Sequence, residues 1–151
     1  MKEFASINEI LDFAIREEQA AVDFYLQLAA QSKNHQTKKI FHEYAEEEMR
    51  HKSNLIQVKE NGTFHLTDAK VKDLKIAEYL VDVKPSANMS YQDALILAMK
   101  KEKAAFRMYT KLAENAEDPA VKATFLNLAQ EESKHKLRFE IEYDDFILKE
   151  N

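Results

Sequence analysis

One short motif, Glu-x-x-His, occurs twice in this sequence, as Glu48-Met-Arg-His51 and Glu132-Ser-Lys-His135, and the two copies are 84 residues apart. A spacing of three places the carboxylate and the imidazole about one turn apart on the same face of a helix. Carboxylate oxygens and imidazole nitrogens are ligands that divalent transition-metal ions accept. Each copy therefore offers a metal ion one oxygen ligand and one nitrogen ligand.

Two further glutamates, Glu18 and Glu102, show the same separation of 84 residues. All four glutamates interrupt apolar stripes of helical spacing, as Glu18 does between Ala14 and Ala21. No lysine or arginine lies on these stripes, and an unpaired buried carboxylate costs several kcal/mol. Two divalent cations would compensate the four charges. We weigh this against four glutamates placed by chance, and the repeated spacing favours metal. The predicted metal ligands, which are also the predicted catalytic residues, are Glu18, Glu48, His51, Glu102, Glu132 and His135.

The sequence also contains a longer internal repeat. Residues 13–57 align with residues 97–141 at a constant offset of 84 and without a gap. Identical pairs outside the motifs include Tyr25/Tyr109 and Phe41/Phe125. A duplication of this kind predicts a bundle with pseudo-twofold symmetry, in which a site on the axis receives equal ligands from each half.

Capping signals divide the chain into four long helices. Ser6-Ile-Asn-Glu9 has the pattern of a capping box and begins a helix that we expect to end near Lys33. After a turn at residues 34–36, a second helix is expected from about Gln36 to Asn61, with Gly62 just past its end. Ser90 and Asp93 are expected to cap a third helix ending near Asn115, and Asp118-Pro119 begins a fourth that reaches about Lys149.

Residues 62–89 connect the second and third helices, and residues 69–82 are expected to form a short extra helix there. Short links within each pair of helices and a long link between the pairs favour two antiparallel hairpins joined by a crossover. The predicted fold is therefore all-α, a four-helix bundle, and residues 1–151 are expected to form a single domain.

Composition narrows the possible functions. The chain has no cysteine, which excludes disulfides, thiolate catalysis, zinc ribbons, iron–sulfur clusters and rubredoxin-type iron sites. The net charge of −5 argues against nucleic acid as a partner. No apolar run is long enough for a membrane span and the first residues lack an apolar signal core, so we expect a cytoplasmic protein with no membrane partner.

At these residues the chain resembles the rubrerythrin branch of the ferritin-like superfamily. The resemblance implies that Glu18 and Glu102 are ligands from the first and third helices. It implies that Glu48 and Glu132 bridge or chelate two metal ions, which His51 and His135 cap. Two iron ions are the expected cofactor.

The resemblance further implies an oxidoreductase that reacts with hydrogen peroxide or dioxygen in defence against oxidative stress, and a homodimer. The chain departs from the family in two respects. It lacks the cysteine-rich rubredoxin domain, so we expect an external electron donor, either rubredoxin-like or a flavoprotein. Ala105 stands where rubrerythrins carry an extra glutamate, which leaves the ligand switching of that glutamate without its residue.

Two other functions remain open from the sequence. One is an iron-binding protein with ferroxidase chemistry for storage or detoxification. The other is a non-redox metal-binding or interaction bundle with manganese or zinc, since imidazole and carboxylate accept those ions too. Substrate hydroxylation would require an apolar pocket.

Several neighbouring residues have alternative interpretations. Tyr25 and Tyr109 follow Glu18 and Glu102 by seven residues, and we expect their hydroxyls to hydrogen-bond the metal-binding carboxylates, or else to be ordinary core aromatics. Glu47 and Glu131 recur in the repeat, but a solvated helix face is the expected reason. Surface positions are expected for the remaining histidines, His35, His42 and His65.

Overall fold

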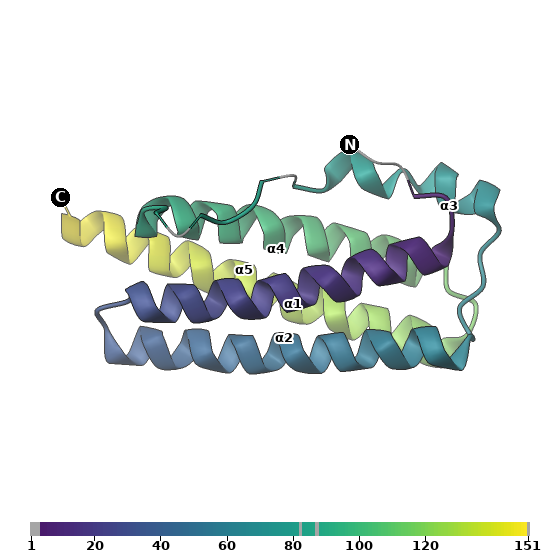
Figure 1. Cartoon of the computed structure of the whole chain (residues 1–151), viewed down its shortest axis with the longest axis horizontal. Helices are drawn as coiled ribbons and strands as arrows, with labels where there is room; N and C mark the ends of the chain where they lie inside the picture. Colours follow the sequence, from purple (N-terminus) through teal and green to yellow (C-terminus); the bar gives the residue numbers. More distant parts are fainter. Residues whose placement is uncertain (1–3, 82, 87, 151) are drawn as a thin grey trace.

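The computed structural model describes residues 4–81, 83–86 and 88–150, and within these residues all regular secondary structure is helical. Four long helices lie side by side and form the bundle (Figure 1). The predicted all-α class is therefore confirmed. No helix in the described residues is both long and apolar enough to span a membrane. The long helices are α1 (Ile7–Gln31), α2 (His35–Asn61), α4 (Tyr91–Glu114) and α5 (Pro119–Glu150).

The helix ends follow the capping residues closely. Ser6 accepts a hydrogen bond from the backbone N–H of Glu9, as predicted, and Gly62 ends α2 in the left-handed conformation with φ 63°. Asp118 accepts hydrogen bonds from two N–H groups in the first turn of α5. The first link differs from the prediction, because Ser32 is extended and Asn34 caps α2, so α1 ends before Lys33 and α2 begins at His35.

The crossover between the hairpins contains two short helices where a single helix was predicted over residues 69–82. These are α3 (Asp68–Leu74) and the 3₁₀ helix η1 (Ile76–Tyr79), separated by Lys75 in the left-handed conformation with φ 52°. The last predicted position, Asp82, lies outside the described residues. Val71, Leu74 and Ile76 are buried, so apolar contacts hold the crossover against the bundle.

Helices α1 and α2 form one antiparallel hairpin, and α4 and α5 form the other (Figure 1). The core consists of two separate apolar clusters. One contains Leu11, Leu55, Leu112 and Phe125 among others, and the second contains Leu28, Phe41, Leu95 and Phe139. In every long helix the predicted polar ligands lie between the residues of these two clusters. The polar residues therefore occupy the middle of the bundle, with apolar packing at both ends.

Candidate metal centre

The structure places all six predicted ligands in the interior of the bundle. Each is at most 3 % exposed. One glutamate comes from α1 and one from α4, while α2 and α5 each supply a glutamate and a histidine. The helical spacing therefore brings together side chains that are up to 117 residues apart in the sequence, from Glu18 to His135.

The ligand atoms form two overlapping groups, and within each group they lie within 4.8 Å of one another. Glu48 and Glu132 belong to both groups. Two shared carboxylates between two groups of four ligands form an arrangement that fits a pair of neighbouring cations. The first group is Glu18, Glu48, His51 and Glu132, and the second is Glu48, Glu102, Glu132 and His135.

Each of these six side chains carries one buried polar atom without a hydrogen-bond partner among the described residues. Nδ1 of His51 lies 2.8 Å from Oε1 of Glu132, and Nδ1 of His135 lies 2.9 Å from Oε1 of Glu48, yet none of these four atoms has a hydrogen-bond partner. Buried polar atoms in folded proteins are nearly always satisfied. Oxygen and nitrogen atoms left unsatisfied at one point fit bound cations. The six atoms are Glu18 Oε2, Glu48 Oε1, His51 Nδ1, Glu102 Oε2, Glu132 Oε1 and His135 Nδ1.

In the absence of metal, protons take up part of this charge. Burial, with the nearby carboxylates Glu48 and Glu102 respectively, raises the pKa of Glu18 and of Glu132 well above its usual range. Burial would also raise the pKa of Glu48, but its polar contacts with Glu18 and the two histidines outweigh burial and lower it. The cluster thus requires positive charge, supplied either by protons or by cations.

The two histidines show the same competition. Burial would lower the pKa of each imidazole, but contacts with Glu18 and Glu48 raise the pKa of His51 to about 10. Contacts with Glu102, Glu47 and Glu48 likewise raise the pKa of His135 to about 12. Because metal binding requires neutral imidazoles and ionised carboxylates, metal must displace these protons.

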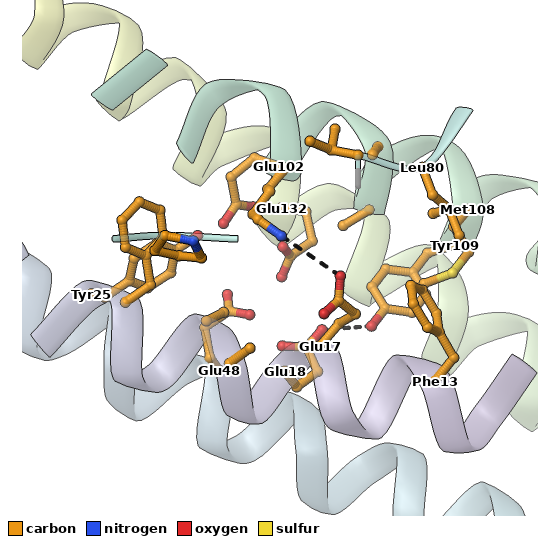
Figure 2. Close-up of a pocket in the computed structure, with 18 residues that line it drawn as sticks. Phe13, Glu17, Glu18, Tyr25, Glu48, Leu80, Glu102, Met108, Tyr109 and Glu132 are labelled. Atoms are coloured by element: carbon orange, nitrogen blue, oxygen red, sulfur yellow. Dashed lines mark hydrogen bonds and ion pairs between the residues drawn. The ribbon is translucent and has the colours of Figure 1, made fainter. Parts of the chain in front are cut away.

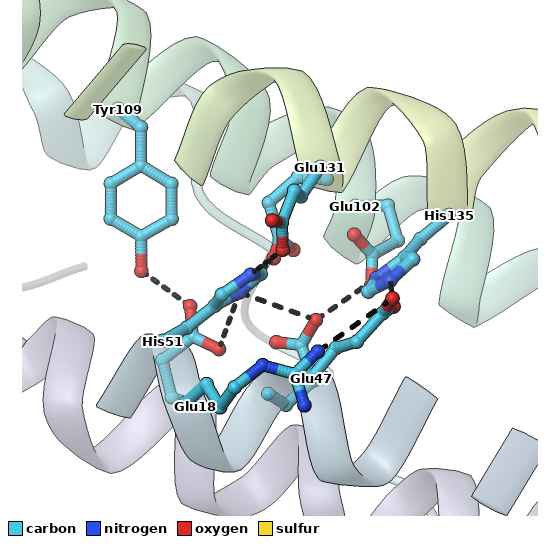
Figure 3. A network of polar contacts seen from close by, with 10 residues as sticks. Glu18, Glu47, His51, Glu102, Tyr109, Glu131 and His135 are labelled. Carbon is cyan, nitrogen blue, oxygen red and sulfur yellow. Dashed lines mark hydrogen bonds and ion pairs between the residues drawn. The ribbon is translucent and has the colours of Figure 1, made fainter. Parts of the chain in front are cut away.

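Glu47 and Glu131 correct one prediction, because they do not serve only a solvated face. Each meets the outer nitrogen of a histidine from the opposite hairpin (Figure 3). Nε2 of His135 lies 2.5 Å from Glu47, and Nε2 of His51 contacts Glu131. An Nε2–H that donates to a carboxylate leaves Nδ1 as the acceptor facing the centre, which is how metal-binding histidines are commonly held. The recurrence of both glutamates in the repeat was the signal for this role.

The two tyrosines of the repeat behave differently from each other. Tyr109 donates a hydrogen bond of 2.5 Å to Glu18, as expected (Figure 3). Among the described residues no hydrogen bond joins Tyr25 to a carboxylate, and its ring lies edge-on to His135 with 6.2 Å between the ring centroids. Tyr44, which the sequence did not single out, stacks on His135 with centroids 4.0 Å apart. The remaining histidines, His35, His42 and His65, are exposed, as predicted.

A family comparison agrees with this geometry. The model of the rubrerythrin family matches residues 9–143, which covers all six buried ligands, Glu47, Glu131 and both tyrosines. No curated protein and no solved structure matches the chain.

Proposed function

The chain belongs to the rubrerythrin family, and on that premise we propose that it binds two iron ions and reduces hydrogen peroxide or dioxygen. The observation that carries the proposal is the convergence of six unsatisfied ligand atoms in a dry part of the bundle. Glu18 and His51 would bind one ion, Glu102 and His135 the other, and Glu48 and Glu132 both.

The number of electrons supports a redox role. When bound, two ferrous ions supply one electron each, which is the number needed to reduce one hydrogen peroxide with two protons to two water molecules. An external donor, rubredoxin-like or a flavoprotein, must return the two electrons, because these 151 residues contain no cysteine for a redox centre of their own.

The residues around the ligands keep them in place. Tyr109 orients Glu18, and Glu131 and Glu47 orient the two imidazoles from the opposite hairpin. The apolar clusters on both sides exclude water, so charges inside the site interact more strongly than they would in solvent. A preorganised centre of this kind requires little rearrangement when its oxidation state changes.

The test is metal content and peroxide turnover of protein loaded with ferrous iron under anaerobic conditions, with Glu132→Gln as the variant. We expect about two irons per chain and peroxide-dependent oxidation of an added reductant, and the variant should lose both. The control is Glu46→Gln, an exposed glutamate of the same type on α2. Iron bound without turnover would indicate iron handling instead, and a preference for zinc or manganese with no redox change would indicate a non-redox bundle.

A further inference from the structure

The two sides of the proposed metal centre differ in which ligands they expose. A pocket between α1 and α4 is lined by all four buried glutamates and by neither histidine (Figure 2). His51 instead borders a separate hollow on the side of α2 and α5. A small molecule that enters from the α1/α4 side therefore meets carboxylates first, and the histidines lie behind them.

The walls of this pocket limit the size of what it can hold. Four alanines line it in symmetric pairs, Ala20 with Ala104 and Ala21 with Ala105, and part of the crossover, including Leu80, covers it. Its volume is about 70 Å³, room for no more than a few water-sized molecules. Hydrogen peroxide and dioxygen fit this space, whereas an organic hydroperoxide with a branched alkyl group does not.

An ion pair spans the pocket from one helix to the other. Nζ of Lys101 on α4 lies 3.8 Å from Oε1 of Glu17 on α1, and both residues line the pocket. Glu17 and Lys101 occupy equivalent positions of the internal repeat. Side chains from equivalent positions of two halves meet where the pseudo-twofold axis passes, and the shared Glu48 and Glu132 lie on that axis as well. The ion pair therefore lies over the centre of the site.

We propose that the α1/α4 pocket is the route by which the oxidant reaches the metal centre, and that the Glu17–Lys101 ion pair is its gate. The gate admits oxidants of two oxygen atoms and excludes organic hydroperoxides. Both side chains are partly exposed, and an ion pair in that setting is weak enough to open and close readily. This inference rests on the proposed function, since it names the class of oxidant for the same site.

The first experiment measures single-turnover oxidation of ferrous protein by hydrogen peroxide and by tert-butyl hydroperoxide. In the wild-type protein the smaller oxidant should react faster. Lys101→Met and Glu17→Gln should each narrow that ratio by about tenfold or more, the scale on which a pocket discriminates by size. Lys59→Met is the matched control, because it breaks an exposed ion pair with Asp12 away from the pocket.

The second experiment uses zinc-loaded protein and xenon, a probe of the pocket that involves no turnover. Methyl NMR signals of Ala21 and Ala105 should shift under xenon pressure in the wild-type protein and should not shift in Ala104→Leu, which fills the pocket. An unchanged oxidant ratio in both gate variants, or an absence of xenon shifts at these methyls, would overturn the inference. If neither oxidant reacts with wild-type protein, the proposed function fails, and the xenon result then decides whether the pocket is open to small molecules.

Discussion

At the scale of single residues, the outer carboxylates Glu47 and Glu131 show how the two hairpins are tied together at the site. Each reaches across the bundle to the imidazole of the other hairpin. Their recurrence was visible in the sequence, but the helical stripe placed them off the core face. Which side chain reaches across depends on how closely α2 and α5 approach each other, and one helix read alone contains no such information.

Replacing Glu131 by Gln should weaken metal binding by about 10- to 100-fold, as is usual when the residue that orients a histidine ligand is lost. The amide cannot stabilise the imidazole N–H as the carboxylate does, so Nδ1 of His51 becomes a weaker ligand. Competition with a chelator of known affinity measures the effect. Glu46→Gln, which alters an exposed glutamate, should bind metal like the wild-type protein.

The pKa shifts predict how the stability of the metal-free protein depends on pH. The pKa of His51 is raised to about 10 and that of His135 to about 12, against about 6.5 in an unfolded chain. Their contribution is therefore complete below about pH 6.5 and is lost as the pH rises through the folded-state values. The raised pKa values of Glu18 and Glu132 act in the same direction, starting from a lower pH.

We therefore expect the thermal midpoint of metal-free protein to fall from about pH 6.5 to pH 9, measured by circular dichroism. Metal-loaded protein should show a much flatter dependence, because the ions replace these protons. A midpoint of the metal-free protein that rises over the same range would contradict the assigned directions.

At the scale of helices, capping residues rather than the apolar pattern determine where the site-bearing segments begin. Asn34 is one example, since its side chain accepts hydrogen bonds from Gln36 and Thr37 and begins α2 one residue earlier than predicted. The crossover is a second example. There the left-handed Lys75 divides the predicted helix, and no glycine marks this conformation in the sequence.

Asn34→Ala should destabilise the protein by about 1 kcal/mol, the usual contribution of an N-cap side chain. Chemical denaturation measures the change, and Lys33→Ala is the control at the preceding exposed position. Because the cap lies at the far end of α2 from the ligands, the metal content should remain that of the wild-type protein. A loss of metal in this variant would show that the helix ends and the site are coupled.

At the scale of the whole molecule, the duplication explains most of what could be predicted. Helical spacing determines which side chains face inward, and the offset of 84 residues pairs them, so the six buried residues and the hairpin architecture could be predicted from the sequence. The asymmetric features could not. Tyr44 stacks on His135, while its repeat equivalent is Leu128, and the resulting difference between the two halves depends on packing.

For the homodimer expected from the sequence, we propose the outer face of α5 as the interface. Leu126, Leu137, Ile141 and Leu148 are exposed, and their spacing puts them on one face of the helix. In an antiparallel pair of α5 helices centred near Phe139, Leu137 lies opposite Ile141 of the partner subunit. Lys134 then lies opposite Asp144 of the partner subunit, so the stripe is complementary to itself in charge as well.

Lys134→Glu should therefore shift the protein toward monomer in sedimentation equilibrium, and adding Asp144→Lys to that variant should restore the dimer. Like charges facing each other account for the first effect, and the exchanged pair accounts for the second. A wild-type monomer, or a double variant no better associated than the single one, would count against this interface.

The most direct test of the account is anomalous diffraction at the iron edge from crystals of iron-loaded protein. The account predicts two neighbouring peaks between Glu48 and Glu132, one beside Glu18 and His51 and the other beside Glu102 and His135. A single peak, peaks elsewhere in the molecule, or none after anaerobic loading with ferrous iron would contradict a di-iron centre built from both halves of the repeat.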